Sequence, residues 1–264
     1  MIDKQKILDT VKSIGDFFGI SDQDYQIDVT DNGTVNISCP ELSQQHSYSR
    51  YYHVSANMSK LPIKFGKVDI SFLVTNCGLT TLENCPDIIN GSFDCSDNPL
   101  TSLIGAPQIV TDHCDMANCG IKSCHGIPKN AKSYNLKNNE IESLEGLHSN
   151  QCEYIDLQGN RLDNLQHCPN TAYLFIQHQK QPIKSLEGIP SGVEYIMIDS
   201  TTPLLLLLDT NINDADRIEI DPADPHAEEI KKLFVKHKNE QKSLPRMGFA
   251  IDLHRLGLGK RAKM

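Results

Sequence analysis

The stretch FDCSDNPLTSLIGAPQ (residues 93–108) decides how this chain folds. Its apolar positions lie two, five, three and three residues apart: Phe93, Cys95, Leu100, Leu103 and Ala106. This spacing keeps neither the two-residue period of a strand nor the period of about 3.6 residues of a helix. The stretch is therefore interpreted as one short strand followed by turns, with a single apolar edge that neighbouring segments must cover.

The same pattern recurs about every 21 residues along the chain. A leucine column runs in steps of 21 with one step of 20: Leu61, Leu82, Leu103, Cys124, Leu144, Leu165, Leu186 and Leu207. A column of asparagine and cysteine precedes it: Cys77, Asn98, Cys119, Asn139 and Asn160. Paired apolar positions further upstream mark the strands: Phe72/Val74, Phe93/Cys95, Cys114/Met116, Tyr134/Leu136, Ile155/Leu157, Leu174/Ile176 and Ile196/Ile198. Self-similarity at a fixed period is the signature of a repeat architecture.

The columns follow the leucine-rich-repeat pattern L-x-L-x-x-(N/C)-x-L-x-x-L, which has one short strand per unit. Each unit has one apolar edge and buries it only by stacking on the next unit. The asparagine or cysteine turns the chain out of the strand, where its side chain can bond exposed backbone groups. We therefore predict an α+β repeat solenoid with units of about 21 residues and one short parallel strand per repeat.

Segments with other patterns flank the repeats. Apolar residues at helical spacing run through residues 2–18 as far as Phe17 and Phe18, and YQIDVTDNGTVNIS alternates around Asp-Asn-Gly. They predict a helix plus β-hairpin N-terminal cap. The segment DPHAEEIKKLFVKHKN (residues 224–239) begins with an N-cap Asp and a Pro, which predicts a helical C-terminal cap. The chain is thus divided into an N-terminal cap (1–50), a leucine-rich repeat array (51–210), a C-terminal cap (211–240) and a basic tail (241–264).

The sequence contains nine cysteines, and we interpret the eight that fall within the repeats as core residues rather than metal ligands; Cys39 lies outside the repeats and has no assigned role. In HCDMANCGIKSCH, Cys114, Cys119 and Cys124 occupy repeat columns, and their spacing of five and five is not the C-x-x-C of a zinc knuckle. The sequence holds no phosphate-binding loop, dinucleotide-binding glycine motif, zinc-protease motif or nucleophile elbow. We therefore expect no catalytic residue, no metal and no cofactor, and a protein that is not an enzyme.

Charge and hydropathy limit the partners. The formal net charge of -9 argues against nucleic-acid binding over the whole surface, although residues 241–264 carry +5. This tail either binds phosphate groups or, as we favour, packs on the last repeat through its apolar residues: Phe249, Ile251, Leu253, Leu256 and Leu258. No apolar run approaches the length of a membrane span. An N-terminus without a signal-peptide pattern and an odd number of cysteines favour the cytoplasm.

Two groups of residues are expected on the outward face of the strands, because side chains alternate between the faces of a sheet. An acidic stripe comprises Asp94, Asp115 and Asp156. An aromatic group comprises Tyr154, Tyr173, Tyr195, Phe175 and Met197. Aromatic residues brought into register are typical interface anchors, and an acidic stripe favours a partner with a basic surface. The alternatives are that the tyrosines only cover the sheet, or that the tail of the chain covers them.

Residues 61–68 (LPIKFGKV) and 93–107 (FDCSDNPLTSLIGAP) resemble the leucine-rich repeat proteins of large tailed bacteriophages, and looser repeats continue to about Pro190. The resemblance implies a phage or prophage origin and a binding scaffold rather than a reaction. We therefore expect a cytoplasmic protein-binding scaffold that engages a host-encoded protein through its strand face. The alternative is a structural or assembly component of a phage particle, docked through the basic tail.

Overall fold

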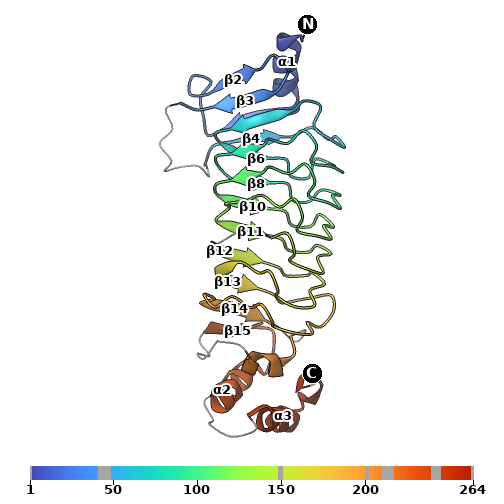
Figure 1. The fold of residues 1–264 in the computed structure, drawn as a ribbon, viewed down its shortest axis with the longest axis vertical. Helices are drawn as coiled ribbons and strands as arrows, with labels where there is room; N and C mark the ends of the chain where they lie inside the picture. The colour runs from blue at the N-terminus through green and yellow to red at the C-terminus, as the bar shows by residue number, and fades with distance from the viewer. Residues whose placement is uncertain are drawn as a thin grey trace.

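The computed structural model describes residues 2–40, 49–147, 151–199, 202–209, 217–238 and 245–262. The chain winds into a parallel β-solenoid of about 7 turns with a spacing of about 21 residues. The turns stack along the long axis of the molecule, with helix α1 (Lys4–Ile14) at one end and the C-terminal helices at the other (Figure 1). The period read from the leucine column is therefore the period of the coil.

One face of the solenoid is a ten-stranded sheet. Its strands follow in this order: β1 (Gly15–Phe18), β4 (Tyr51–Val54), β6 (Ser71–Leu73), β8 (Phe93–Asp94), β10 (His113–Asp115), β11 (Ser133–Asn135), β12 (Gln151–Asp156), β13 (Asn170–Phe175), β14 (Tyr195–Ile198) and β15 (Ile218–Ile220). Strand β1 pairs antiparallel with β4, and the remaining neighbours are parallel. Equivalent residues of successive repeats therefore lie side by side.

A second sheet shows that the prediction of one strand per repeat is wrong for the first turns. Its five strands are β2 (Gln26–Val29), β3 (Val35–Ser38), β5 (Phe65–Val68), β7 (Ile88–Ile89) and β9 (Ile109–Val110). Strands β2 and β3 form the predicted hairpin, and β5, β7 and β9 follow in parallel. The reason is composition, because β-branched pairs at 88–89 and 109–110 suit a strand. The next turn has Lys129 there and keeps only a single bridge to Ile109.

The leucine column forms the middle of the core, and each of its eight members is buried. The chain closes each loop tightly around it. At Gly105, for example, φ is +90° and an added Cβ would lie 2.8 Å from the carbonyl carbon of Leu82 in the preceding turn. A side chain would be strained there and would collide with that backbone, which explains the glycine in the I-G-A-P segment.

The asparagine column satisfies the backbone where each strand ends. Asn139 Oδ1 accepts hydrogen bonds from the backbone N–H groups of Cys119 (3.1 Å) and Ile121 (3.0 Å) in the preceding turn. Its Nδ2 donates to the carbonyl oxygens of Met116, Leu136 and Lys137. Asn98 repeats all five of these bonds one turn earlier. The predicted corner bonding is therefore confirmed.

Gln179 continues this column, although the sequence pattern did not include it. Its Oε1 accepts from Leu162 N and its Nε2 donates to the carbonyl oxygens of Leu157 and Ile176. Between Gln179 and the next column residue, Ile183, the chain has two residues more than between Asn160 and Leu162. There Lys180 Nζ donates to Asn139 O (2.7 Å) and Gln181 Nε2 donates to Arg161 O (3.1 Å). The side chains of Lys180 and Gln181 thus bond the backbone of earlier turns.

The N-terminal segment differs from the prediction in where its helix ends. Helix α1 begins after the N-cap Asp3, whose side chain accepts from Lys6 N, and it stops at Ile14. Phe17 and Phe18, expected on the helix, lie in β1 opposite Tyr52 and Tyr51. Strand pairing with β4 thus overrides the helical spacing of these two residues.

The C-terminal segment contains the 3-10 helix η2 (Leu204–Asp209), helix α2 (Ala227–Lys238), helix α3 (Pro245–Arg255) and the 3-10 helix η4 (Gly259–Ala262). Helix α2 begins later than predicted, but Asp224 Oδ1 still accepts from His226 N. Helix α3 contacts α2 and η2 and buries Phe249 and Leu253, so this part of the tail is packed. Ile251, expected to pack with them, is exposed.

Candidate functional site

The strand face of the last turns brings the predicted aromatic residues together. Tyr154, Tyr173 and Tyr195 are register partners on β12, β13 and β14, as are Asp156, Phe175 and Met197. The ring centroids of Tyr154 and Phe175 lie 5.0 Å apart, those of Phe175 and Tyr195 5.9 Å, and those of Tyr173 and Tyr195 6.1 Å. We call Tyr154, Tyr173, Phe175, Tyr195 and Met197 the aromatic patch.

The aromatic patch is partly open to solvent. Tyr173 has 47% of its surface exposed, and the other four members are partly buried. The rings support one another at their edges and have few rotatable bonds, so a partner would order them at little entropic cost. Exposed Glu153 and Glu194 directly precede Tyr154 and Tyr195 in the chain. Glu219, the register partner of Met197 on β15, brings a carboxylate to the same face of the sheet, where Lys231 pairs with it (2.9 Å).

The acidic stripe has a structural role that the sequence analysis missed. Each residue of this row accepts a hydrogen bond from the backbone N–H two residues further on: Asp94 from Ser96, Asp115 from Ala117, Asn135 from Lys137 and Asp156 from Gln158. Such bonds stabilise the turn at the strand end and explain why aspartate or asparagine occupies these four positions. Asp94 and Asp115 remain partly exposed.

Asp156 was predicted to face outward and contact a partner, and the structure shows that this prediction is wrong because its side chain is buried. It is 5% exposed, and its Oδ2 accepts from the Tyr154 hydroxyl (3.1 Å) and from Gln158 Nε2 (3.1 Å). Burial raises the pKa of Asp156, while the bond from Gln158 N opposes that shift. Burial, followed by the charge of Asp156, raises the pKa of Tyr154 as well. Asp156 therefore holds the Tyr154 hydroxyl by a hydrogen bond, and its buried side chain is not positioned to contact a partner.

The cysteines of the repeats lie in the core as predicted, and Cys39, for which the repeats made no prediction, is buried too. Eight are buried and Cys168 is partly buried, and all nine are free thiols. Burial raises the pKa of Cys85 and of Cys124 to about 12. Cys119 is an exception, because a hydrogen bond involving Cys95 lowers its pKa, yet its side chain is buried too. These thiols fit packing rather than nucleophilic chemistry.

We expect the native protein to resist alkylation. Iodoacetamide reacts with exposed thiolates, and burial both blocks access and disfavours the thiolate. At neutral pH, mass spectrometry should find little modification of the folded chain and up to nine carbamidomethyl groups after unfolding in urea. Rapid modification of Cys85 or Cys124 in the folded chain would contradict the core assignment.

A cluster that the sequence analysis did not identify lies beside the aromatic patch. His178 Nδ1 lies 2.9 Å from Asp199 Oδ2, and His178 Nε2 lies 3.5 Å from Asp221 Oδ2. The three residues come from three successive turns, after β13, β14 and β15. The signal was the 21-residue period, because Asp199 follows His178 by 21 residues and Asp221 follows Asp199 by 22.

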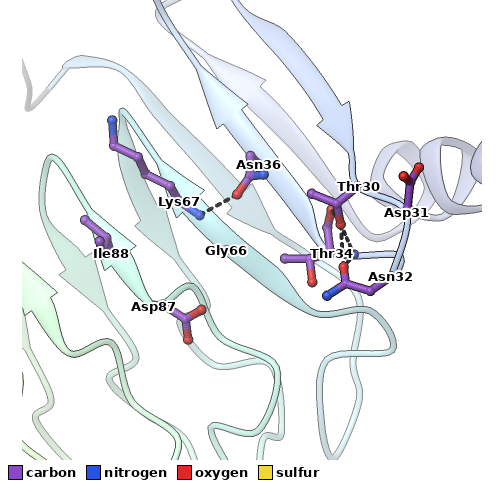
Figure 2. A pocket seen from close by; sticks show the side chains of 9 residues that line it. All are labelled: Thr30, Asp31, Asn32, Thr34, Asn36, Gly66, Lys67, Asp87 and Ile88. Carbon is purple, nitrogen blue, oxygen red and sulfur yellow. Dashed lines mark hydrogen bonds between the residues drawn. The ribbon is translucent and has the colours of Figure 1, made fainter.

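A pocket lies at the other end of the molecule, against the second sheet (Figure 2). It is lined by Thr30, Asp31, Asn32, Thr34, Asn36, Gly66, Lys67, Asp87 and Ile88. Its charged groups already have partners within the chain: Lys67 pairs with Asp69 (2.9 Å), and Asp87 with Lys64 (2.7 Å). Asn36 Oδ1 accepts from Lys67 N. These pairings leave the pocket less suited to a charged ligand than the strand face.

No protein-family model, curated protein or solved structure matches this chain. Among the described residues, no helix is long and apolar enough to cross a membrane. The functional argument therefore depends on the geometry of the strand face.

Proposed function

We propose that this protein is a non-enzymatic binding scaffold that engages another protein through the aromatic patch. The observation that carries the proposal is the exposed Tyr173 ring, held in register between Tyr154 and Tyr195 on a rigid sheet. Tyrosine anchors on rigid elements lose little entropy on binding and are frequent hot spots of interfaces. The solenoid supplies the rigid elements, and its leucine-rich-repeat columns fit a scaffold role.

The partner we propose has a basic surface. Exposed Glu153 and Glu194 directly precede two patch tyrosines in the chain, and Asp94 and Asp115 are partly exposed along the same sheet. Complementary charge on the partner would speed association and orient it on the sheet. The resemblance of residues 61–68 and 93–107 to leucine-rich repeat proteins of large tailed bacteriophages favours a partner encoded by the bacterial host.

The alternative, a particle component docked through a basic tail, has less support. Arg255 pairs with Asp252 (3.0 Å), and Arg261 pairs with Asp224, so two of the tail cations are engaged within the chain. Burial of Phe249 and Leu253 favours a tail that packs on the solenoid end. Mass spectrometry of purified particles distinguishes the two functions, because only the assembly component would be present in them.

Replacing Tyr173 and Phe175 together with alanine should weaken partner binding by about 30-fold or more, the effect of losing a hot-spot residue. The experiment uses wild-type and double-variant proteins as matched baits in a bacterial lysate, followed by Kd measurement on each protein that only the wild type retains. The melting temperature should change little, because Tyr173 is exposed and Phe175 is partly exposed.

A control double variant replaces Leu73 and Thr75 with alanine at the far end of the same sheet. Both residues are partly buried, like Phe175, but they lie outside the aromatic patch. This control should keep the wild-type Kd. If the Tyr173 and Phe175 double variant retains every partner with unchanged Kd, the patch is not the binding site.

A further inference from the structure

We propose that His178, Asp199 and Asp221 form a binding site for a divalent transition-metal ion of the zinc class. This inference is independent of the protein-binding proposal. One ring nitrogen of His178 and one oxygen from each carboxylate lie within 4.8 Å of one another. Ligand atoms of a tetrahedral zinc site lie about 3.4 Å apart, given metal–ligand distances of about 2.0–2.2 Å. Separations of up to 4.8 Å exceed this value by up to about 1.4 Å, so binding an ion requires the exposed His178 ring or the partly exposed Asp221 side chain to move.

The donor set selects the class of ion. An imidazole nitrogen with two carboxylate oxygens suits Zn²⁺, Co²⁺ and Mn²⁺, whereas Ca²⁺ and Mg²⁺ prefer sites made of oxygen alone. Three protein ligands leave coordination positions that water can fill. His178 and Asp221 keep 57% and 24% of their side-chain surface exposed, so an ion can enter from solvent.

Charge supplies the second argument. With both carboxylates ionised, the cluster is negative whether or not the His178 ring is protonated. The Asp199 side chain is only 7% exposed, and its Oδ2 already accepts from His178 N. Two carboxylates held beside one imidazole attract a cation. A divalent cation neutralises both and can coordinate the uncharged ring.

The backbone holds the donors at fixed positions. His178 has φ +58° at the place where earlier turns have Asn118, Asn138 and Gly159, all with positive φ. Those three donate their N–H groups to backbone carbonyls of the next turn. His178 N instead donates to Asp199 Oδ2 at 2.6 Å. Asp199 is thereby fixed beside His178, and Asp221, which directly follows β15, completes the group from the last turn.

Two buried oxygens without a hydrogen-bond partner belong to residues close in sequence to the cluster. Thr202, whose N–H donates to Asp199 O, is fully buried, and its Oγ1 has no hydrogen-bond partner. Gln177, the chain neighbour of His178, is also buried and has an unpartnered Oε1. Unsatisfied buried oxygens are uncommon, and each of these two lies within three positions of a cluster residue in the chain.

The test is a titration of the metal-depleted full chain with Co²⁺ and Zn²⁺, followed by calorimetry and visible absorption. We expect one ion per chain, a cobalt spectrum without a thiolate charge-transfer band, and a melting temperature that rises with ion concentration. His178→Asn should weaken binding by about tenfold or more, because it removes the nitrogen ligand. Asparagine already occupies this left-handed position at Asn118 and Asn138, so the variant should fold.

Two further variants complete the test. Asp221→Asn keeps the oxygen that accepts from Ala223 N (2.9 Å) but loses the charge, and it should also weaken binding. His167→Asn is the matched control, because His167 is exposed, has φ +67° and lies outside the cluster. The proposal is overturned if the wild type shows no saturable binding, if a thiolate band appears, or if His178→Asn binds as tightly as His167→Asn.

Discussion

Replacing Asn139 with alanine will lower the free energy of unfolding by about 3–6 kcal/mol, because each buried backbone group left without a partner costs about 1–3 kcal/mol. Asn139 is fully buried and makes five hydrogen bonds with the backbone of two successive turns. Alanine would strand two N–H groups and remove a donor from three carbonyls. Water would reach some of these groups only if the turn opened.

Urea unfolding followed by circular dichroism measures this loss. Asn164→Ala is the control, since Asn164 is partly exposed and accepts one local bond, from Gln166 N. It should cost about 1 kcal/mol or less. Asn139→Asp tests the mechanism, because it keeps the acceptor but turns an oxygen toward carbonyl oxygens, and it should destabilise at least as strongly. A loss below about 1 kcal/mol for Asn139→Ala would show that the corner bonds do not hold the turns together.

Column periodicity was enough to predict the solenoid, its period and its core. Every coil repeats the same contacts, so leucines 21 residues apart signal a three-dimensional neighbour relation directly. Gln179 was missed because its longer amide side chain makes the hydrogen bonds that asparagine makes in other turns. The two extra residues after it also change its spacing to the next apolar column. Matching by hydrogen-bonding ability rather than by residue identity would have found it.

Features that depend on pairing partners were harder to predict. Phe17 and Phe18 continue the helical spacing of α1. They nevertheless form part of strand β1, because the backbone of this segment pairs with strand β4. Strands β7 and β9 contain only two residues each, too short for any alternation to show. Their existence depends on neighbours a full turn away, which no local pattern reports.

For the candidate site, register was predictable and burial was not. Alternation along the strands placed Tyr154, Tyr173 and Phe175 together, as the structure does. It also placed Asp156 on the surface, but the Tyr154 hydroxyl and the Gln158 amide cover that carboxylate. The cluster of His178 and two aspartates was missed because its members come from three turns and match no short motif.

Replacing Tyr52 with alanine should destabilise the protein by about 3–5 kcal/mol, the usual cost of deleting a buried aromatic ring. Tyr52 is fully buried between the N-terminal segment and the first turns. Its ring centroid lies 4.9 Å from that of Phe17, 5.9 Å from that of Phe65 and 5.7 Å from that of Phe72. No other described ring has three aromatic neighbours in this part of the chain, so the cavity left by alanine would loosen the whole cluster.

Tyr52→Phe separates packing from hydrogen bonding at the same position. The Tyr52 hydroxyl donates to Val11 O of helix α1 at 2.6 Å, and phenylalanine removes only this bond, at a cost of about 1 kcal/mol. Urea unfolding should rank alanine well below phenylalanine, and hydrogen exchange should speed up in α1 for both variants. Tyr51→Ala is the control, because Tyr51 is partly exposed and stacks on Phe18 instead. If Tyr52→Ala were no more destabilising than Tyr51→Ala, the N-terminal helix and the solenoid would not share one cooperative core, and α1 would open independently of the coils.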